Sequence, residues 1–431
     1  MNEVVCEAPR NDAGFSALDR LLRRRLLSQL DRVSGRRLQI ADALGTTEVG
    51  AGDDVTPLRI RVHDAAFYRA IAASGSVGAG EAYIDGLWIC DDLVELVRTL
   101  VVNRDLLDGM EAGLARWGSW ALSGWNALRR NTRAGSRRNI AAHYDLGNDF
   151  FALFLSPDLM YSSAVFADDP DTLEAASRRK LEHICRKLNL RPGDRVIEIG
   201  SGWGGFALHA AKHYGCHVTT TTISREQYAL ATERIKTAGL ADRVTLLLDD
   251  YRDLSGRYDK LVSIEMIEAI GHEYLDTYFE KIGTLLARDG LALVQAITIE
   301  DHRYERALRS VDFIKRHVFP GCFIPSIAAM TAAKTRTSDL ALIHLEDFGD
   351  SYARTLNAWR ERFLARLADV RAQGYDARFI RLWEFYLAYC EGGFRERSIG
   401  VSQLLLAKPG WRRAGFPSGL TLDHRLRQAT P

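Results

Sequence analysis

The pattern of hydrophobic and polar positions changes near residue 135. Before this point the chain predicts short helices and strands without regular alternation. The predicted elements are a basic amphipathic helix and turn at 20–38, a strand at 57–64, a helix at 65–75 that Gly75 caps, turns at 80–88, and a helical stretch at 91–130. A polar basic run, "RRNTRAGSRRN", follows, and we place the main domain boundary there.

After residue 135, strands alternate with helices. The predicted strands are 195–200, 217–224, 243–250, 258–266, 290–299, 340–348 and 398–408. The predicted helices are one that ends at Gly215 and others at 225–240, 272–287, 352–372 and 377–390. Such alternation indicates a parallel, doubly wound α/β sheet.

Length and composition limit the classes of function. We expect a smaller α+β domain with its basic linker over 1–135, an α/β domain over 136–411 and a tail over 412–431. The formal net charge of +1 gives no field that would attract nucleic acid. The six cysteines include no CxxC pair, and no secretory signal or membrane-spanning run is visible. We therefore expect a cytoplasmic protein with reduced thiols and no metal site. The arginine-rich helix allows two interpretations, a solvated face or a contact with a membrane surface.

Three glycines at alternate positions, Gly200, Gly202 and Gly204, follow the first strand of the α/β domain. A ligand of an open parallel sheet binds at such a point, beyond the carboxyl ends of the strands. The spacing is GxGxGG rather than GxGxxG, and the next strand ends without the acid that binds a dinucleotide ribose. Trp203 and Phe206 stand where a P-loop has its Gly-Lys-Ser/Thr, so a triphosphate is not expected either.

Residues around this loop favour S-adenosylmethionine. Glu198 precedes the first glycine by two positions and could place a carboxylate near the methionine ammonium group. Asp250 and Tyr251 follow the third strand, where the adenine edge and face would lie. The alternative interpretation of Glu198 is a solvated residue at a strand end.

An ordered set of motifs carries a resemblance to a known family. The motifs are "GEAYIDGLW", "HYDLGNDFFALFLSPDLMYSSAVF", "RVIEIGSGWGGFALHAA", "TTISREQ", "DDYRDL", "VFPGCFIPS" and "YCEGGFRERSIG". Together they resemble the cyclopropane-fatty-acyl-phospholipid synthase family, which includes the mycolic acid cyclopropane synthases. The resemblance implies a class I S-adenosylmethionine-dependent methyltransferase fold, Rossmann-like, with seven strands of which the last is antiparallel. It also implies methyl transfer to the double bond of an unsaturated acyl chain, commonly on a membrane phospholipid.

The resemblance assigns a cofactor site and an anion site to numbered positions. Contacts to S-adenosylmethionine, besides the predicted Asp250, would come from Tyr161, Ser162, Glu198, Gly200, Gly202, Trp203, Gly204, Thr222, Ile223, Gln227, Tyr251 and Ile264. A bicarbonate ion would be held at the catalytic positions Ser163, Glu268, Gln295, Ile297 and Tyr352, and the catalytic cysteine would be Cys390. The family has Cys at position 163 and His at position 295, and it usually has Gly where this chain has Glu265.

The chemistry demands a dry pocket and a base. An alkene is a weak nucleophile, so it must be held against the sulfonium methyl group, and the resulting carbocation then loses a proton. Gln295 cannot titrate, which leaves Glu268, beside Glu265, as a candidate base. Aromatic rings either stabilise the cation or simply pack the core; the candidates are Tyr144, Phe150, Phe151, Trp383, Tyr386 and Tyr389.

The product depends on which proton leaves. Loss from the new methyl group closes a cyclopropane, which we expect as the product. A methylene- or methyl-branched chain is the alternative, and a lipid-binding protein without turnover is an alternative of another class. The expected partner is an unsaturated phospholipid at the cytoplasmic face of the membrane, where the protein would be peripheral. Two further partners are compatible with the sequence: a second copy of the chain in a homodimer, and a reductase if the product is methyl-branched.

Overall fold

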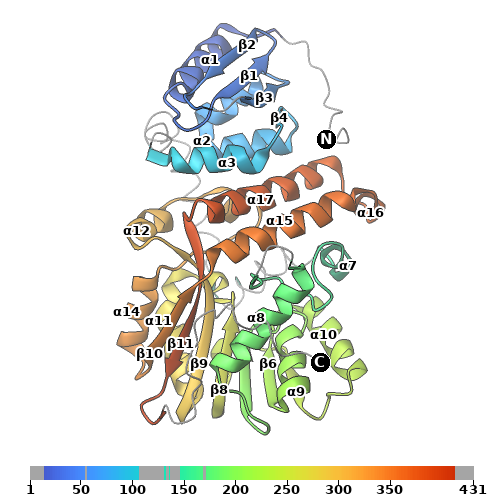
Figure 1. Cartoon of the computed structure of the whole chain (residues 1–431), viewed down its shortest axis with the longest axis vertical. Helices are drawn as coiled ribbons and strands as arrows, with labels where there is room; N and C mark the ends of the chain where they lie inside the picture. Colours follow the sequence, from blue (N-terminus) through green and yellow to red (C-terminus); the bar gives the residue numbers. More distant parts are fainter. Residues whose placement is uncertain are drawn as a thin grey trace. The chain divides into compact units, whose positions relative to one another are not determined.

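The computed structural model describes residues 14–53, 56–105, 131–132, 135, 146–167 and 171–412. The chain divides into two compact units, which interleave in sequence (Figure 1). The first unit contains Met1–Leu128, Arg309–Pro320 and Trp359–Ser398, and the second contains Arg129–Leu308, Gly321–Ala358 and Ile399–Pro431. Most of the basic linker, Tyr144 and the tail after Arg412 lie outside the described residues, so the predicted domain limits stay predictions.

The first unit is built on a four-stranded sheet of order β2-β1-β3-β4. Strand β1 pairs in parallel with β3 and antiparallel with β2. In β3 the apolar residues are buried and the two arginines between them are exposed, as the alternation predicted. The elements are α1 (Ala17–Leu30), β1 (Leu38–Asp42), β2 (Gly45–Val49), β3 (Leu58–Val62), α2 (Ala66–Ile84), β4 (Trp88–Cys90), α3 (Leu93–Val102), α13 (Phe313–His317), α16 (Leu367–Ala372) and α17 (Ala377–Arg395).

Gly75 interrupts the helix where the sequence predicted its cap, but a second helical segment follows it. Helix α2 bends at Gly75 (φ 55°, ψ −130°) and continues to Ile84, so residues 80–84, predicted as a turn, are helical. A Cβ atom on Gly80 would lie 2.6 Å from the Phe313 ring. The turn predicted over 80–84 was therefore wrong, because Gly80 permits close packing within a helix.

The second unit contains a seven-stranded sheet of order β10-β11-β9-β8-β5-β6-β7. Strand β11 is antiparallel to both of its neighbours, which confirms the predicted class I fold with its antiparallel last strand. The elements are α7 (Asn148–Ala152), α8 (Leu173–Lys187), β5 (Arg195–Ile199), α9 (Gly205–Tyr214), β6 (His217–Thr221), α10 (Arg225–Thr237), β7 (Val244–Leu247), η2 (Tyr251–Asp253), β8 (Tyr258–Ile264), η3 (Ile267–Ala269), η4 (His272–Tyr274), α11 (Leu275–Leu285), β9 (Leu286–Ile299), α14 (Ile327–Thr337), β10 (Ala341–Asp347) and β11 (Ile399–Ala407). Helices α12 (Asp301–Arg309) and α15 (Gly349–Ala365) supply residues to both units.

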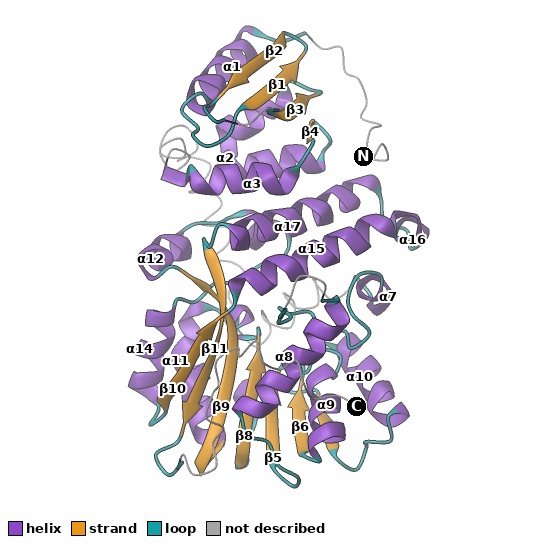
Figure 2. Ribbon diagram, viewed as in Figure 1, coloured by secondary structure: helices purple, strands orange, loops and turns teal. Residues whose placement is uncertain are grey.

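Helices cover both faces of this sheet (Figure 2), and a hydrophobic cluster lies on each face. Helices α11 and α14 cover one face, and α8 and α9 cover the other. Neighbouring residues of β5 alternate between the two clusters, since Ile197 packs with α11 and Val196 packs with α8. Among the described residues, no helix is long and apolar enough to span a bilayer.

Candidate active site

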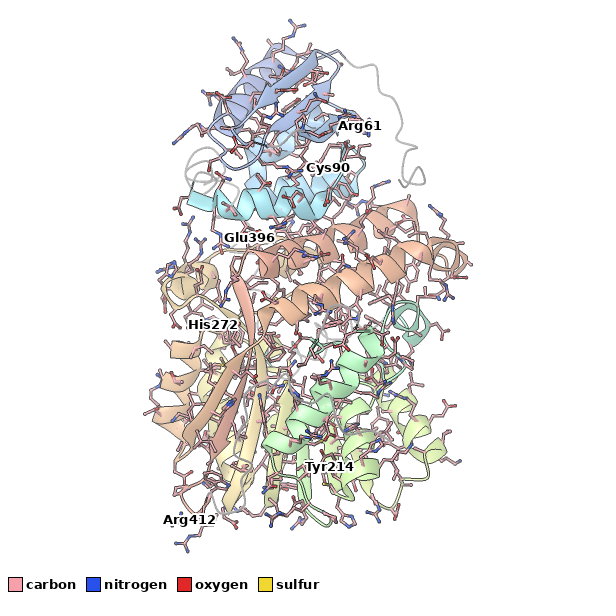
Figure 3. The ribbon with its side chains drawn as sticks, viewed as in Figure 1. Arg61, Cys90, Tyr214, His272, Glu396 and Arg412 are labelled. Carbon is pink, nitrogen blue, oxygen red and sulfur yellow. The ribbon has the colours of Figure 1, made fainter. Side chains whose placement is uncertain are left out.

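Four loops meet at the carboxyl ends of the parallel strands. They are the glycine loop after β5, residues 222–227 after β6, residues 250–251 after β7 and residues 265–268 after β8. His272 lies near this end of the sheet in Figure 3, and Tyr214 lies near the opposite end. Since ligands of open α/β sheets bind beyond the carboxyl ends, these loops form the candidate site.

The glycine loop presents bare main chain at the end of β5. Gly200, Gly202 and Gly204 have φ values of 94°, 48° and 84°, which residues with a side chain rarely adopt. Helix α9 begins directly afterwards at Gly205, where a Cβ atom would lie 2.5 Å from the Met160 sulfur. The glycine loop leaves its main-chain groups uncovered by side chains, which suits a cofactor that binds to the main chain.

Trp203 supports the loop from within the protein. It is 2% exposed, its indole N–H donates to Asn148 Oδ1 (2.6 Å), and its carbonyl accepts from Arg234 (2.5 Å). The ring of Phe151 lies 5.1 Å from that of Trp203 and 5.2 Å from that of Tyr161. Phe151 therefore packs the wall of the predicted cofactor site.

Glu198 is buried, so its interpretation as a solvated residue was wrong. The side chain is 1% exposed and accepts a hydrogen bond from the Thr220 hydroxyl (2.5 Å). Burial raises the pKa of Glu198 to about 8, against which Thr220 and the Lys180 ammonium act. A carboxyl group kept out of water at this position is available to a polar ligand.

The loops after β6 and β7 are partly paired within the protein. The Thr222 hydroxyl donates to Gln227 Oε1 (2.8 Å). Both carboxylate oxygens of Asp250 accept from the Arg252 guanidinium group (2.8 and 2.6 Å). Tyr251 is 8% exposed, and its hydroxyl has no hydrogen-bond partner among the described residues, so this group can still bind a ligand.

The carboxylate of Glu265 occupies the predicted anion site. Its Oε1 accepts from the Ser163 N–H (2.9 Å) and from Gln295 Nε2 (2.7 Å), and its Oε2 accepts from the Tyr352 hydroxyl (2.8 Å). The Ser163 hydroxyl turns away and donates to the Ala164 carbonyl (2.9 Å). Three of the five positions that the resemblance gives to bicarbonate thus bind Glu265. These residues do not fit a separate bicarbonate ion, because the charge of Glu265 already takes its donors.

Glu268 lies beside Glu265 and differs from it in its hydrogen bonds. Its Oε1 accepts from the Ile297 N–H (2.5 Å), and its buried Oε2 has no hydrogen-bond partner among the described residues. Burial, and then the negative charge of Glu265, raises the pKa of Glu268 to about 8. Glu268 therefore carries a proton at neutral pH.

Glu265 has three hydrogen-bond donors, which favour the carboxylate form over the acid. Burial raises its pKa, but hydrogen bonds from Gln295, Ser163 and Tyr352 and the charge of Lys180 act in the opposite direction. Its φ of 48° lies in the left-handed region, where a residue other than glycine is strained. The chain thus accepts a strained backbone at a position where the family usually has glycine.

Lys180 is a site residue that the sequence analysis missed. It is completely buried on α8, and its ammonium group donates to the Ser162 hydroxyl (2.7 Å). Burial lowers the pKa of Lys180 to about 8, while Asp158, Glu265 and Glu198 act to raise it. A signal was present, because Lys180 lies seven residues after the buried Leu173 and four before the buried Ile184, on the apolar face of α8.

The remaining predicted residues lie at three places. Ile264 is the last residue of β8, and Ile223 lies between β6 and α10; both are half-buried. Cys390 is half-buried on α17, which belongs to the first unit, whereas the other predicted catalytic residues belong to the second. The same helix carries three of the aromatic candidates, Trp383, Tyr386 and Tyr389.

Comparison with known proteins identifies relatives with this architecture. Residues 131–404 match the model of the family described as mycolic acid cyclopropane synthetase. The chain is 35% identical over 423 residues to the tuberculostearic acid methyltransferase UfaA1 of Mycobacterium tuberculosis, covering 94% of this chain and 95% of that protein. It is 37% identical over 354 residues to the cyclopropane-fatty-acyl-phospholipid synthase of Escherichia coli, covering 82% and 88%. The structure of mycolic acid cyclopropane synthase CmaA1 complexed with SAH and CTAB matches 63% of this chain and 98% of that one, with a TM-score of 0.59 and 29% identity.

Proposed function

Because the chain belongs to the mycolic acid cyclopropane synthetase family and is an S-adenosylmethionine-dependent methyltransferase, we propose that it methylates the double bond of an unsaturated phospholipid acyl chain. The cofactor, when bound at the glycine loop, supplies an electrophilic methyl group. The observation that carries the proposal is the Glu265 carboxylate, held by three donors at the carboxyl end of β8. A buried carboxylate that keeps a free lone pair can accept the proton that a carbocation intermediate loses.

We assign the base role to the pair of glutamates, with Glu265 accepting the proton. Protons next to a carbocation are very acidic, so the position of the acceptor matters more than its strength. Glu265 has one oxygen with a single donor, Tyr352, which leaves a lone pair of Oε2 for the proton. Neutral Glu268 adds no second negative charge, which would otherwise oppose ionisation of Glu265.

Two products follow from two positions of the departing proton. Loss from the new methyl group gives a cyclopropane, as the name of the Escherichia coli relative suggests for this chain. A methylene-branched chain is the second candidate. It is supported by the replacements at Glu265, Ser163 and Gln295, and by the similarity to a tuberculostearic acid methyltransferase over 94% of this chain.

Product analysis tests the proposal. Purified protein is incubated with methyl-labelled S-adenosylmethionine and vesicles of an oleoyl phospholipid, and the acyl esters are examined by proton NMR, because the two products have the same mass. Ring protons are expected, and vinylidene protons would establish the second candidate instead. Cofactor binding without any lipid product would contradict the proposal and support a lipid-binding protein without turnover.

Helix α1 supplies a surface suited to an anionic membrane. Leu18 and Leu21 are 54% and 41% exposed, and Arg24 and Arg25 are exposed on the same side of the helix. Apolar side chains beside arginines are typical of a helix that lies on a bilayer surface. We propose that this face, the α1 face (Leu18, Leu21, Arg24 and Arg25), brings the protein to its lipid.

Other arginines of the basic segment are already paired. Arg23 binds Asp42 (2.6 Å), Arg36 lies 3.7 Å from Glu95, and Arg37 lies 3.9 Å from Glu48. The membrane-contact interpretation is therefore restricted to the α1 face.

A further inference from the structure

A row of polar side chains crosses the sheet from its edge to Glu265. Backbone pairing places Glu346 of β10 opposite Gln403 of β11, and Gln403 opposite Gln295 of β9. Opposite residues of antiparallel strands share a face, so the three side chains are neighbours. Gln295 is also paired with Ile264, the residue before Glu265. The row therefore ends at the carboxylate that we propose as the base.

Hydrogen bonds join the row into one chain. Gln295 Nε2 donates to Glu265 Oε1 (2.7 Å), and Gln295 Oε1 accepts from Gln403 Nε2 (3.0 Å). Gln403 Oε1 accepts from the ammonium group of Lys187 (2.7 Å), the last residue of α8. Lys187 also contacts the carboxylate of Glu346.

Lys187 fixes the orientation of both side-chain amides in this hydrogen-bonded row. An ammonium group can only donate, so Gln403 must turn its oxygen toward Lys187 and its NH₂ group toward Gln295. Gln295 must then turn its oxygen toward Gln403 and its own NH₂ group toward Glu265. The reverse orientation would point an amide oxygen at the Glu265 carboxylate and remove a donor from it.

Burial makes this arrangement costly unless it is complete. Gln295, Gln403 and Lys187 are 0%, 1% and 2% exposed. A buried amide or ammonium group that lacks its partner is strongly destabilising. The folded protein is therefore stable only when every hydrogen bond of this row is formed. Leucine and methionine of similar volume would pack an apolar sheet face more simply, so packing does not explain the row.

We propose that Lys187 is a positioning residue for the base: through the amides of Gln403 and Gln295 it keeps a donor directed at Glu265. This inference rests on the proposed function for its effect on turnover. Lys187 itself touches none of the predicted reacting groups. Lys187 lies seven residues after Lys180 on the apolar face of α8, so this helix carries two buried cations.

Other titratable groups surround Glu265 and Lys187, the two ends of the row, and also affect the pKa of Glu265. Glu265 faces Lys180 from α8, Glu268 from η3 and Tyr352 from α15. Lys187 faces Glu346 and His344 from β10 and His183 from its own helix. Burial lowers the pKa of His183 to about 4, so this imidazole is neutral near pH 7 and does not replace the lysine charge.

The test is the titration of Glu265 in a Lys187→Met variant. Loss of the cation and of the oriented donor is expected to raise the pKa of Glu265 by about one unit. Carbon NMR of protein labelled at the glutamate carboxyl carbon measures this titration without turnover, with Glu265→Gln used to assign the signal. The acidic limb of the pH profile of kcat/KM is expected to move upward by the same amount, because the base must be ionised.

Three further variants separate positioning from structure. Arg186→Met removes a half-exposed cation from the same helix and is expected to leave the titration unchanged. Gln403→Met breaks the chain at its middle amide and is expected to reproduce the shift. Lys187→Met/Glu346→Leu replaces the buried ion pair by apolar groups, which preserves folding if Lys187→Met alone does not fold.

The outcomes are distinct. An unchanged Glu265 titration in a folded variant that lacks Lys187 would overturn the inference, even if thermal stability falls. A shifted titration in a protein that methylates no lipid would uphold the positioning role and refute the proposed function.

Discussion

At the residue scale, Glu265 is the most informative position in the chain. Its backbone is strained, and its carboxylate receives hydrogen bonds from three elements that lie far apart in sequence. Ser163 and Gln295 looked like losses from an anion site when considered alone. In the structure they are donors to a carboxylate that belongs to the protein, so the three replacements form one coherent set.

Glu265→Gly tests whether this carboxylate stands in place of a free anion. The variant restores the residue usual in the family, relieves the strained φ and removes the proposed base. We expect turnover to fall by about 100-fold or more, with unchanged affinity for S-adenosylmethionine by calorimetry.

Added bicarbonate supplies the control for this variant. It is expected to restore part of the activity of Glu265→Gly and to leave the unsubstituted protein unaffected, while Glu233→Gln, an exposed acid on α10, changes neither. Full activity of Glu265→Gly without bicarbonate would show that the base is another group.

At the element scale, the start of α9 determines the geometry of the cofactor site. Gly205 packs so closely on Met160 and on the Asp158 carbonyl that no Cβ atom fits. The glycine pattern predicted the bare loop, but the sequence contained no signal that residues 158–160 lie against it. That contact forms only because α8 and its preceding loop pack beside α9.

Gly205→Ala is expected to weaken cofactor binding. The new methyl group must displace backbone or the Met160 side chain, at a cost of about 1–3 kcal/mol in the free energy of unfolding, and the loop moves with it. We expect the Kd for S-adenosylmethionine to rise about tenfold or more.

Gly239→Ala at the end of α10 is the matched control. Gly239 also has a positive φ (69°), but its Cβ would meet nothing within 4 Å. It should lose stability through backbone strain alone and keep its cofactor affinity. Equal affinities in the two variants would show that the Gly205 contact does not shape the site.

At the scale of the whole molecule, the two proposed tasks belong to different units. The α1 face lies in the first unit, and the glycine loop and the glutamate pair lie in the second. Since the substrate is proposed to reside in a bilayer, membrane affinity and catalysis should respond to different substitutions.

Arg24→Ser/Arg25→Ser is expected to weaken binding to anionic vesicles by about tenfold or more, because each arginine near such a surface contributes about 1 kcal/mol. Cosedimentation with phosphatidylglycerol vesicles measures the effect, and vesicles of neutral lipid provide the baseline. Arg257→Ser/Arg288→Ser removes two exposed arginines from the second unit and should change little. Unchanged cosedimentation of the first variant would exclude the α1 face as the contact.

The sequence by itself determined the alternating α/β sheet and the bare glycine loop, because periodicity and glycine spacing are local properties of the chain. Its motifs, through the family that they resemble, added the class I fold and strengthened the prediction of the cofactor. It also located Glu265, Glu268 and Tyr352 as residues of interest. Only the tertiary structure decided how they are used. The burial of Glu198, the donors around Glu265 and the row that ends at Lys187 depend on strand register and helix packing, which join residues from 22 to 216 positions apart. The protonation of these glutamates follows from those contacts, because burial and neighbouring charges determine a pKa and local sequence predicts neither.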